Sequence, residues 1–246
     1  MGTVLWERMA RTAGAPGKAL SPALIAATAV TVADVDGLDA ITMRRLATEL
    51  GVTPMAAYRH VSNKDEVLAL MVDLVYGEID LPAGTEWRET LWAMAQEVRA
   101  LTLRHPWLTR LSAPQMIYEL TPNRLALTER ALTALHTGLG FDLDTAMAVC
   151  RTISAYVQGA TSAEIGLGEL MNENGWSTGA DARAGLSPQM RWLLATDRYP
   201  TFARYIHEAA RKDDLRWQFD TGLTQVLHGI AIGAGNIGTA GPPEQR

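Results

Sequence analysis

The residues best suited to chemistry lie between positions 42 and 64, and that chemistry is hydrogen bonding, positive charge and small apolar contact. Arginine can donate two parallel hydrogen bonds to a guanine edge, hydroxyl, imidazole and ammonium groups bond phosphates, and small apolar side chains fit thymine methyl groups. We therefore predict a DNA-reading surface here. Its candidate residues are Thr42, Arg44, Thr53, Pro54, Met55, Ala56, Tyr58, Arg59, His60 and Lys64.

Two short helices joined by a tight turn must position these side chains. Leu46 and Leu50 are spaced so that they give the first helix an apolar face, and Gly51 follows where a left-handed residue would end it. Thr53 can cap a second helix, with Pro54 at its first position. An exposed helix held by a partner through a glycine turn suits insertion into a DNA major groove.

Several of these residues have an alternative role. For Arg44 the alternatives are a base contact, a phosphate contact and a solvated helix charge. Thr53 is either a reader or only a helix cap, and Tyr58 either contacts phosphate or packs inside the protein. Arg45 is interpreted as a solvent charge or a phosphate contact.

Composition bounds the kind of protein. Of 246 residues 48% are hydrophobic, enough for a sizeable core, yet no apolar run reaches the roughly 18–20 residues that span a bilayer. The N-terminus lacks the basic-then-apolar order of a secretory signal. Cys150 is the single cysteine, which excludes a disulfide framework. We expect a cytoplasmic protein with no membrane contact.

The net charge of −5 is divided unevenly along the chain. Residues 1–64 carry seven basic and five acidic side chains, whereas the rest carries fifteen and twenty-two. This asymmetry places any phosphate-facing surface at the N-terminal end, although ordinary charge scatter would also account for it.

Helical spacing of apolar residues recurs along the whole chain, and no period-two strand pattern is present, so we predict an all-α fold. We expect a flexible arm over 1–20, which is either a disordered leader or a basic DNA contact, and a helix-turn-helix DNA-binding domain over 21–66. A larger helical regulatory domain should cover 67–235, followed by a disordered tail over 236–246. The expected helices are 22–36, 42–50, 53–61, 63–79, 87–104, 121–139, 142–171, one starting at 187, 200–212 and 216–233, with a loop over 172–186.

The N-terminal stretch resembles the TetR (tetracycline-repressor) family of bacterial regulators. The resemblance rests on Ser21-Pro22, on Ala33-Asp34 to Gly37-Leu38, on residues 42–47, on Leu50-Gly51-Val52 and on Tyr58-Arg59-His60-Val61-x-Asn63-Lys64. It implies a homodimer with two DNA-reading heads on a pseudo-palindromic operator and a helical domain that binds a small effector. It also implies that effector binding moves the helix beginning at Lys64 and so changes the separation of the heads. Arg59 stands where the tetracycline-responsive members have an aromatic residue, so their preference for a particular operator sequence is not carried over.

The C-terminal part is rich in tryptophan and methionine, which suits a large apolar or aromatic ligand, although such residues more often form core. Among polar residues Arg151 is notable, because a buried arginine needs an acidic partner from the ligand or the protein. No tetracycline-contacting residue or magnesium site is carried over from the family. The ligand-binding candidates are Trp92, His105, Trp107, Met116, Met147, Arg151, Tyr156 and Trp176.

No catalytic arrangement, metal spacing or cofactor motif stands out. Gly233-x-Gly235-x-x-Gly238 has the spelling of a dinucleotide fingerprint but follows a helix rather than a strand. We therefore predict a ligand-responsive transcriptional repressor that is not an enzyme and uses no cofactor. The alternative is an all-helical small-molecule binding protein or enzyme whose helix-turn-helix is only structural, and a gel-shift with operator DNA separates the two.

Overall fold

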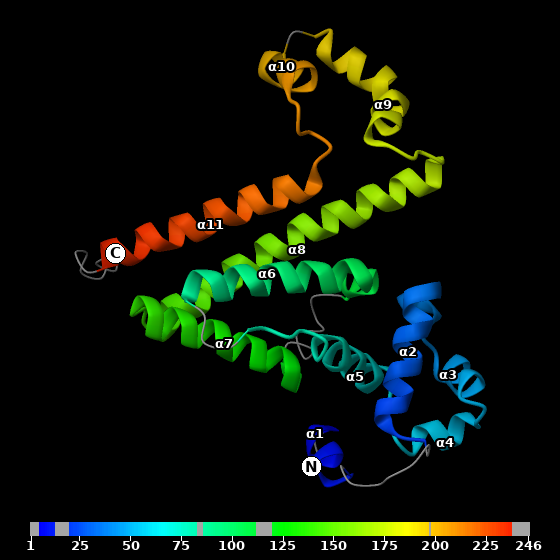
Figure 1. Ribbon diagram of the computed structural model, residues 1–246. Coiled ribbons are helices and arrows are strands. Elements are labelled where there is room, and N and C mark those ends of the chain that lie inside the picture. The colour runs from blue at the N-terminus through cyan, green and yellow to red at the C-terminus, as the bar shows by residue number, and fades with distance from the viewer. Residues whose placement is uncertain (1–4, 13–19, 83–85, 112–119, 197, 238–246) are drawn as a thin grey trace, which may run out of the picture. The chain divides into compact units, whose positions relative to one another are not determined.

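The computed structural model describes residues 5–12, 20–82, 86–111, 120–196 and 198–237. Its regular elements in those ranges are all helical, which confirms the all-α prediction (Figure 1). The chain divides into two compact units, Met1–Cys150 and Arg151–Arg246. Among the described residues, no helix is both long and apolar enough to cross a membrane.

The first unit contains the N-terminal helices and the beginning of the long helix α8. Its elements are α1 (Leu5–Thr12), α2 (Pro22–Asp36), η1 (Leu38–Ala40), α3 (Met43–Glu49), α4 (Pro54–Tyr58), α5 (Lys64–Tyr76), α6 (Trp87–Arg104), η2 (Pro106–Arg110) and α7 (Pro122–Leu139). Helix α8 (Leu143–Asn174) continues into the second unit, which also holds α9 (Gly179–Leu194), α10 (Pro200–Glu208) and α11 (Leu215–Ile237).

Local capping signals set where the N-terminal helices begin. Ser21 Oγ accepts a hydrogen bond from the Leu24 N–H at 3.2 Å, and Asn63 Oδ1 accepts one from the Glu66 N–H at 2.8 Å. Each satisfies a backbone donor that the first helical turn leaves free. Gly37 has φ 83°, in the left-handed region that glycine enters without strain, and it separates α2 from η1.

Helices α2, α3, α5 and η2 share one apolar core. Ile25, Leu46 and Met71 are fully buried in this cluster, and Trp107 of η2 reaches it from the far end of α6. The elements before residue 66 therefore do not have a core of their own. Burial of these side chains supplies the main stabilisation of the first unit.

Helix α1 differs from the flexible arm predicted over residues 1–20. Leu5 is buried, and Trp6 and Met9 pack against the core cluster. A short helix of this kind is held by packing rather than by its own propensity, which is why no sustained period marks it in the sequence. Residues 13–19 lie outside the described residues.

The loop predicted over 172–186 is confined to residues 175–178, because α8 continues to Asn174 and α9 begins at Gly179. Thr178 Oγ1 accepts from the Asp181 N–H at 3.1 Å, and Asp181 Oδ2 accepts from the Thr178 N–H at 2.8 Å, which is a reciprocal capping box. Pro188, predicted to start a helix, lies inside α9 instead. Helix α11 likewise continues beyond the predicted 233 to Ile237, and residues 238–246 of the predicted tail are outside the described residues.

A hydrogen-bonded junction joins α5 to the start of α7. Asp73 Oδ1 accepts from the Asn123 N–H at 2.8 Å, and Asn123 Nδ2 donates to the Asp73 carbonyl at 2.9 Å. A Cβ atom at Gly77 would lie 2.9 Å from Asn123 Nδ2, so the two helices approach closely here. Burial raises the pKa of the Asp73 carboxyl, and the hydrogen bond from Asn123 offsets part of that rise.

Replacing Asp73 by asparagine should change how stability depends on pH. Because the pKa of Asp73 is higher in the folded chain than in the unfolded chain, its ionisation lowers stability as the pH rises above about 4. Asparagine keeps an acceptor for the Asn123 N–H and does not ionise. Thermal melts from pH 4 to pH 7 should show Asp73→Asn gaining stability relative to the wild type as the pH rises. A constant difference across that range would contradict this account.

Candidate nucleic-acid interface

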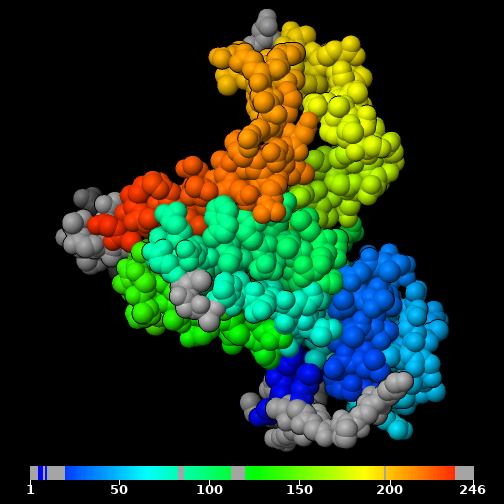
Figure 2. All heavy atoms as spheres, viewed as in Figure 1, coloured from blue at the N-terminus to red at the C-terminus, as the bar shows by residue number. Residues whose placement is uncertain are grey.

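The helix pair α3–α4 lies on the side of the first unit turned away from α6 and α7 (Figure 1). Thr42 Oγ1 accepts from the Arg45 N–H at 3.1 Å and starts α3, and Thr53 Oγ1 accepts from the Ala56 N–H at 3.2 Å and starts α4. Gly51, with φ 67°, makes the turn between them. In the space-filling view these segments lie at the outer surface of the first unit (Figure 2).

The two neighbouring arginines of α3 have different surroundings. Arg45 Nη2 lies 2.9 Å from Asp36 Oδ2, and its Nε lies 2.7 Å from Glu49 Oε1. Arg44 is exposed, and its side chain has no hydrogen bond or ion pair with any described residue. Arg44 is therefore available to a ligand outside the protein, whereas Arg45 is already neutralised by two carboxylates.

Helix α4 presents a mixed apolar and polar face to solvent. Met55 is 69% exposed and Tyr58 is 48% exposed, and Pro54 is exposed beside them. Ala57 and Val61 are buried and fix the other face of the segment against the core. The capping bond occupies one lone pair of Thr53, so its hydroxyl can still donate while it caps.

The remaining candidates for DNA contact surround α4. Thr42, Arg59 and Lys64 are exposed, and Ala56 and His60 are half-buried. Lys64 is the first residue of α5, directly after its Asn63 cap. The exposed basic side chains of Arg44, Arg59 and Lys64 therefore belong to one continuous segment that also exposes Tyr58. Such a surface can bind phosphates and reach base edges.

Two predicted ligand residues have partners on the N-terminal helices. Asp34 of α2 accepts hydrogen bonds from His105 Nδ1 and Trp107 Nε1, each at 2.8 Å. Sequence reasoning included Asp34 in the run that carries the resemblance but gave it no role, because nothing local marks a carboxylate that pairs with residues more than seventy positions away. Met116, a third predicted residue, lies outside the described residues.

In the second unit, Tyr156 and Trp176 make packing contacts between helices. Tyr156 Oη donates to the Phe219 carbonyl at 2.7 Å, and its ring lies over Gly222, where a Cβ would be 2.8 Å from ring carbons. Trp176 covers Gly185 of α9 so closely that a Cβ there would overlap the indole. Arg151 is exposed rather than buried, so it does not need the acidic partner considered from the sequence.

Trp92 of α6 and Met147 of α8 are half-buried in the first unit. One hollow of about 350 Å³ lies among α1, α2, α5 and α7, and another of about 500 Å³ lies between Tyr205 and Trp217. None of the predicted ligand residues lines either hollow. Among the described residues no group of three or more His, Cys, Asp or Glu side chains is arranged to hold a metal ion.

Comparison with known proteins gives two family matches that together cover most of the chain. Residues 25–71 match the model of bacterial regulatory proteins of the tetR family, and residues 81–233 match the tetracyclin repressor-like C-terminal domain. The first match contains the α3–α4 pair, and the second begins shortly after α5.

Individual relatives cover nearly the full length. The HTH-type transcriptional repressor DrrR1 of Streptomyces coeruleorubidus is 32% identical over 232 residues, 93% of this chain and 84% of the relative. An HTH-type transcriptional regulator of Saccharopolyspora erythraea is 34% identical over 213 residues, 86% of this chain and 84% of the relative. The crystal structure of ActR from Streptomyces coelicolor in complex with actinorhodin has 28% identity and a TM-score of 0.70, and covers 90% of this chain and all of ActR.

Proposed function

The chain belongs to the TetR family of bacterial transcriptional regulators. We therefore propose that it is a cytoplasmic homodimer that represses transcription by binding operator DNA. A small, largely apolar or aromatic effector releases it. The family fixes the class of protein, a DNA-binding regulator. The operator, the dimer and the nature of the effector are the proposed parts.

The observation that carries the DNA-binding proposal is the unpaired Arg44 beside the exposed face of α4. Because Arg44 has no side-chain partner among the described residues, it breaks no ion pair with them when it binds a base or phosphate. Met55 and Tyr58 add an exposed apolar and hydroxyl surface next to it. In a dimer, two such surfaces would enter successive major grooves about 34 Å apart.

Support for the effector proposal comes from ActR, whose crystal structures include complexes with (S)-DNPA and with actinorhodin. Two of the proposed ligand residues, Trp92 and Met147, are half-buried apolar side chains, which suits a large apolar ligand. Release then requires that the effector bind the DNA-free conformation more tightly than the DNA-bound one.

A paired titration tests the effector proposal, with actinorhodin as the probe. Tryptophan fluorescence of the full-length protein reports binding, and anisotropy of labelled operator DNA reports release. Quenching and release should occur over the same concentration range. Quenching with unchanged DNA affinity would reject the proposed coupling, and it would favour the other class considered, a helical small-molecule binding protein with a structural helix-turn-helix.

A further inference from the structure

A cluster of polar side chains joins the end of α2 to the corner where α6 meets η2. Asp34 Oδ1 accepts from both His105 Nδ1 and Trp107 Nε1, each at 2.8 Å. On the other side of the imidazole, Nε2 lies 3.4 Å from Glu78 Oε1, close enough for an ion pair though without hydrogen-bond geometry. Arg104 Nη2 lies 2.9 Å from Glu78 Oε2. We call these five residues the Asp34 cluster.

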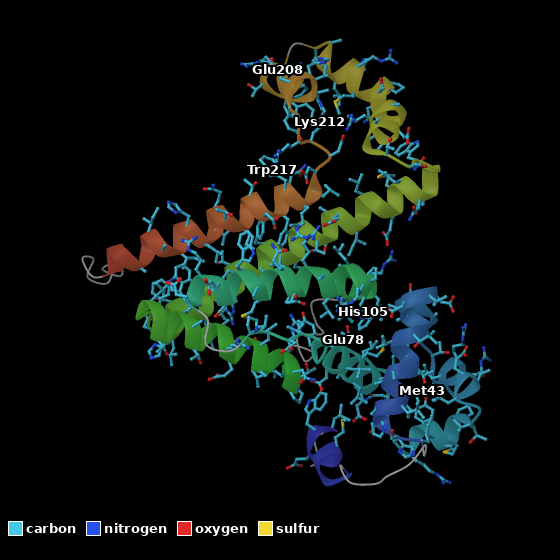
Figure 3. The ribbon with its side chains drawn as sticks, viewed as in Figure 1. Met43, Glu78, His105, Glu208, Lys212 and Trp217 are labelled. Atoms are coloured by element: carbon cyan, nitrogen blue, oxygen red, sulfur yellow. The ribbon has the colours of Figure 1, made fainter. Side chains whose placement is uncertain are left out.

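The Asp34 cluster connects one corner to two helices of the N-terminal part. Asp34 belongs to α2, and Glu78 lies just after the end of α5. Figure 3 shows His105 and Glu78 next to one another, near the end of α6. The corner of α6 therefore contacts a carboxylate from the helix that supports α3–α4 and another from the turn directly after α5.

Burial makes the bonds to Asp34 difficult to replace. Trp107 is 2% exposed and His105 is 8% exposed, so water has little access to either ring. A carboxylate only accepts, so His105 Nδ1 carries the proton in this bond. Removal of the Asp34 carboxylate would leave two buried donors without a partner, which is more costly than the loss of an exposed bond.

The hydrogen bonds of the Asp34 cluster depend on direction, whereas the packing of the apolar core around it does not. Apolar packing between α2 and α5 depends on buried area and tolerates small rotations. Hydrogen bonds weaken steeply once the donor–acceptor distance or angle departs from its optimum. Two hydrogen bonds to one carboxylate oxygen therefore fix the orientation of α2 relative to the corner of α6 and η2. Because α2 supports the α3–α4 pair, they also fix the orientation of that pair.

We propose that Asp34 is a positioning residue: through His105 and Trp107 it sets the orientation of α2–α4 against the corner of α6. The spacing at which a dimer can read two half-sites then depends on this corner. The effect on half-site spacing rests on the proposed operator binding. The role of Asp34 in orienting α2–α4 concerns the free protein and does not depend on DNA. His105 is the residue between α6, which ends at Arg104, and η2, which begins at Pro106, so a displacement along α6 would reach Asp34 through His105.

Hydrogen exchange of the full-length protein tests the structural part without DNA. Trp107→Phe removes the indole donor and keeps most of the packing, and Asp34→Asn removes the charge and keeps an oxygen acceptor. In both variants the amides of α2–α4 should exchange about tenfold faster relative to those of α7. Asp36→Ala is the matched control, because Asp36 lies on the same helix and its one ion pair among the described residues is with the exposed Arg45. Variants that exchange like the control would overturn the proposal.

A series of operators with altered half-site spacing tests the consequence for DNA. The wild type should bind operators of one half-site spacing with about tenfold or more higher affinity than operators whose spacing is changed by two base pairs. In Trp107→Phe and Asp34→Asn this preference should shrink to about threefold or less. A purely structural role would lower affinity for all spacings equally, and that result would overturn the proposal.

The two possible failures are distinguishable. A wild-type protein that binds no operator would reject the proposed function, and hydrogen exchange alone would then decide the role of Asp34. A wild type that binds with a clear spacing preference, together with variants that keep it, would reject the positioning role and leave the proposed function intact.

Discussion

Replacing Arg44 by alanine is expected to weaken binding to the operator by roughly 10- to 100-fold, because a bidentate arginine–guanine contact contributes about 1–3 kcal/mol. Arg44 is exposed, and it has no hydrogen bond or ion pair to lose with any residue that the structure describes. The loss should therefore appear in DNA affinity and not in thermal stability. Fluorescence anisotropy with labelled operator measures the affinity, and a thermal melt of the same sample measures the stability.

Arg45→Ala is the matched control, since the two arginines are neighbours on α3 and differ in their partners. Arg45 is held by Asp36 and Glu49, so its replacement should leave operator affinity within about threefold of the wild type. Equal losses for the two variants would contradict the role given to Arg44.

The kind of contact that Arg44 makes can also be separated. Loss of a base contact should relax the preference for one base at one operator position. Loss of a phosphate contact should instead weaken binding to all sequences alike, and it should reduce the slope of log affinity against log salt concentration by about one per contact. Tyr58→Phe, which removes a hydroxyl expected to contact phosphate, should follow the second pattern.

A second large effect is expected at Gly222 of α11. Its replacement by alanine would place a Cβ 2.8 Å from carbons of the Tyr156 ring and closer still to the phenol oxygen. The ring must move, which breaks the hydrogen bond from Tyr156 Oη to the Phe219 carbonyl and disturbs its packing on the Phe219 ring, 5.5 Å away between centroids. We expect a loss of about 1–3 kcal/mol, or several degrees in Tm.

A double-mutant cycle identifies the cause of that loss. A Tyr156→Ala background removes the three atoms nearest to the added Cβ, so the glycine-to-alanine change should become neutral or stabilising by up to about 1 kcal/mol through helix propensity. If Gly222→Ala were equally destabilising in both backgrounds, the contact between Gly222 and Tyr156 would not be its origin.

The elements of the N-terminal part follow from local signals that can be read along the sequence. Ser21, Thr42, Thr53 and Asn63 each cap the helix predicted to follow them, because a cap depends on residues within one helical turn. The same kind of signal, the Thr178–Asp181 capping box, was present at the start of α9 and was overlooked in a stretch of loop-like composition.

Features that depend on distant residues could not be predicted in this way. Asp34 meets His105 and Trp107 across more than seventy positions, so no period or spacing marks it. His105 and Trp107 were interpreted as ligand residues because they are large polar or aromatic side chains in an apolar setting. The structure gives both of them the same acceptor on α2, and their contact with a ligand stays a prediction. Helix α1 was missed for a related reason, since Leu5, Trp6 and Met9 hold it by packing against a core built from distant residues.

The central claim, that the surface of residues 42–64 reads operator DNA, is tested most directly by selection from a random duplex library followed by footprinting of the selected sequence. We predict a pseudo-palindrome whose half-sites lie one helical turn apart, about 10 base pairs between centres, bound in the presence of excess non-specific DNA. Arg44→Ala should not protect it at the same protein concentration. Recovery of no preferred sequence at low salt, or equal protection by Arg44→Ala, would contradict the claim.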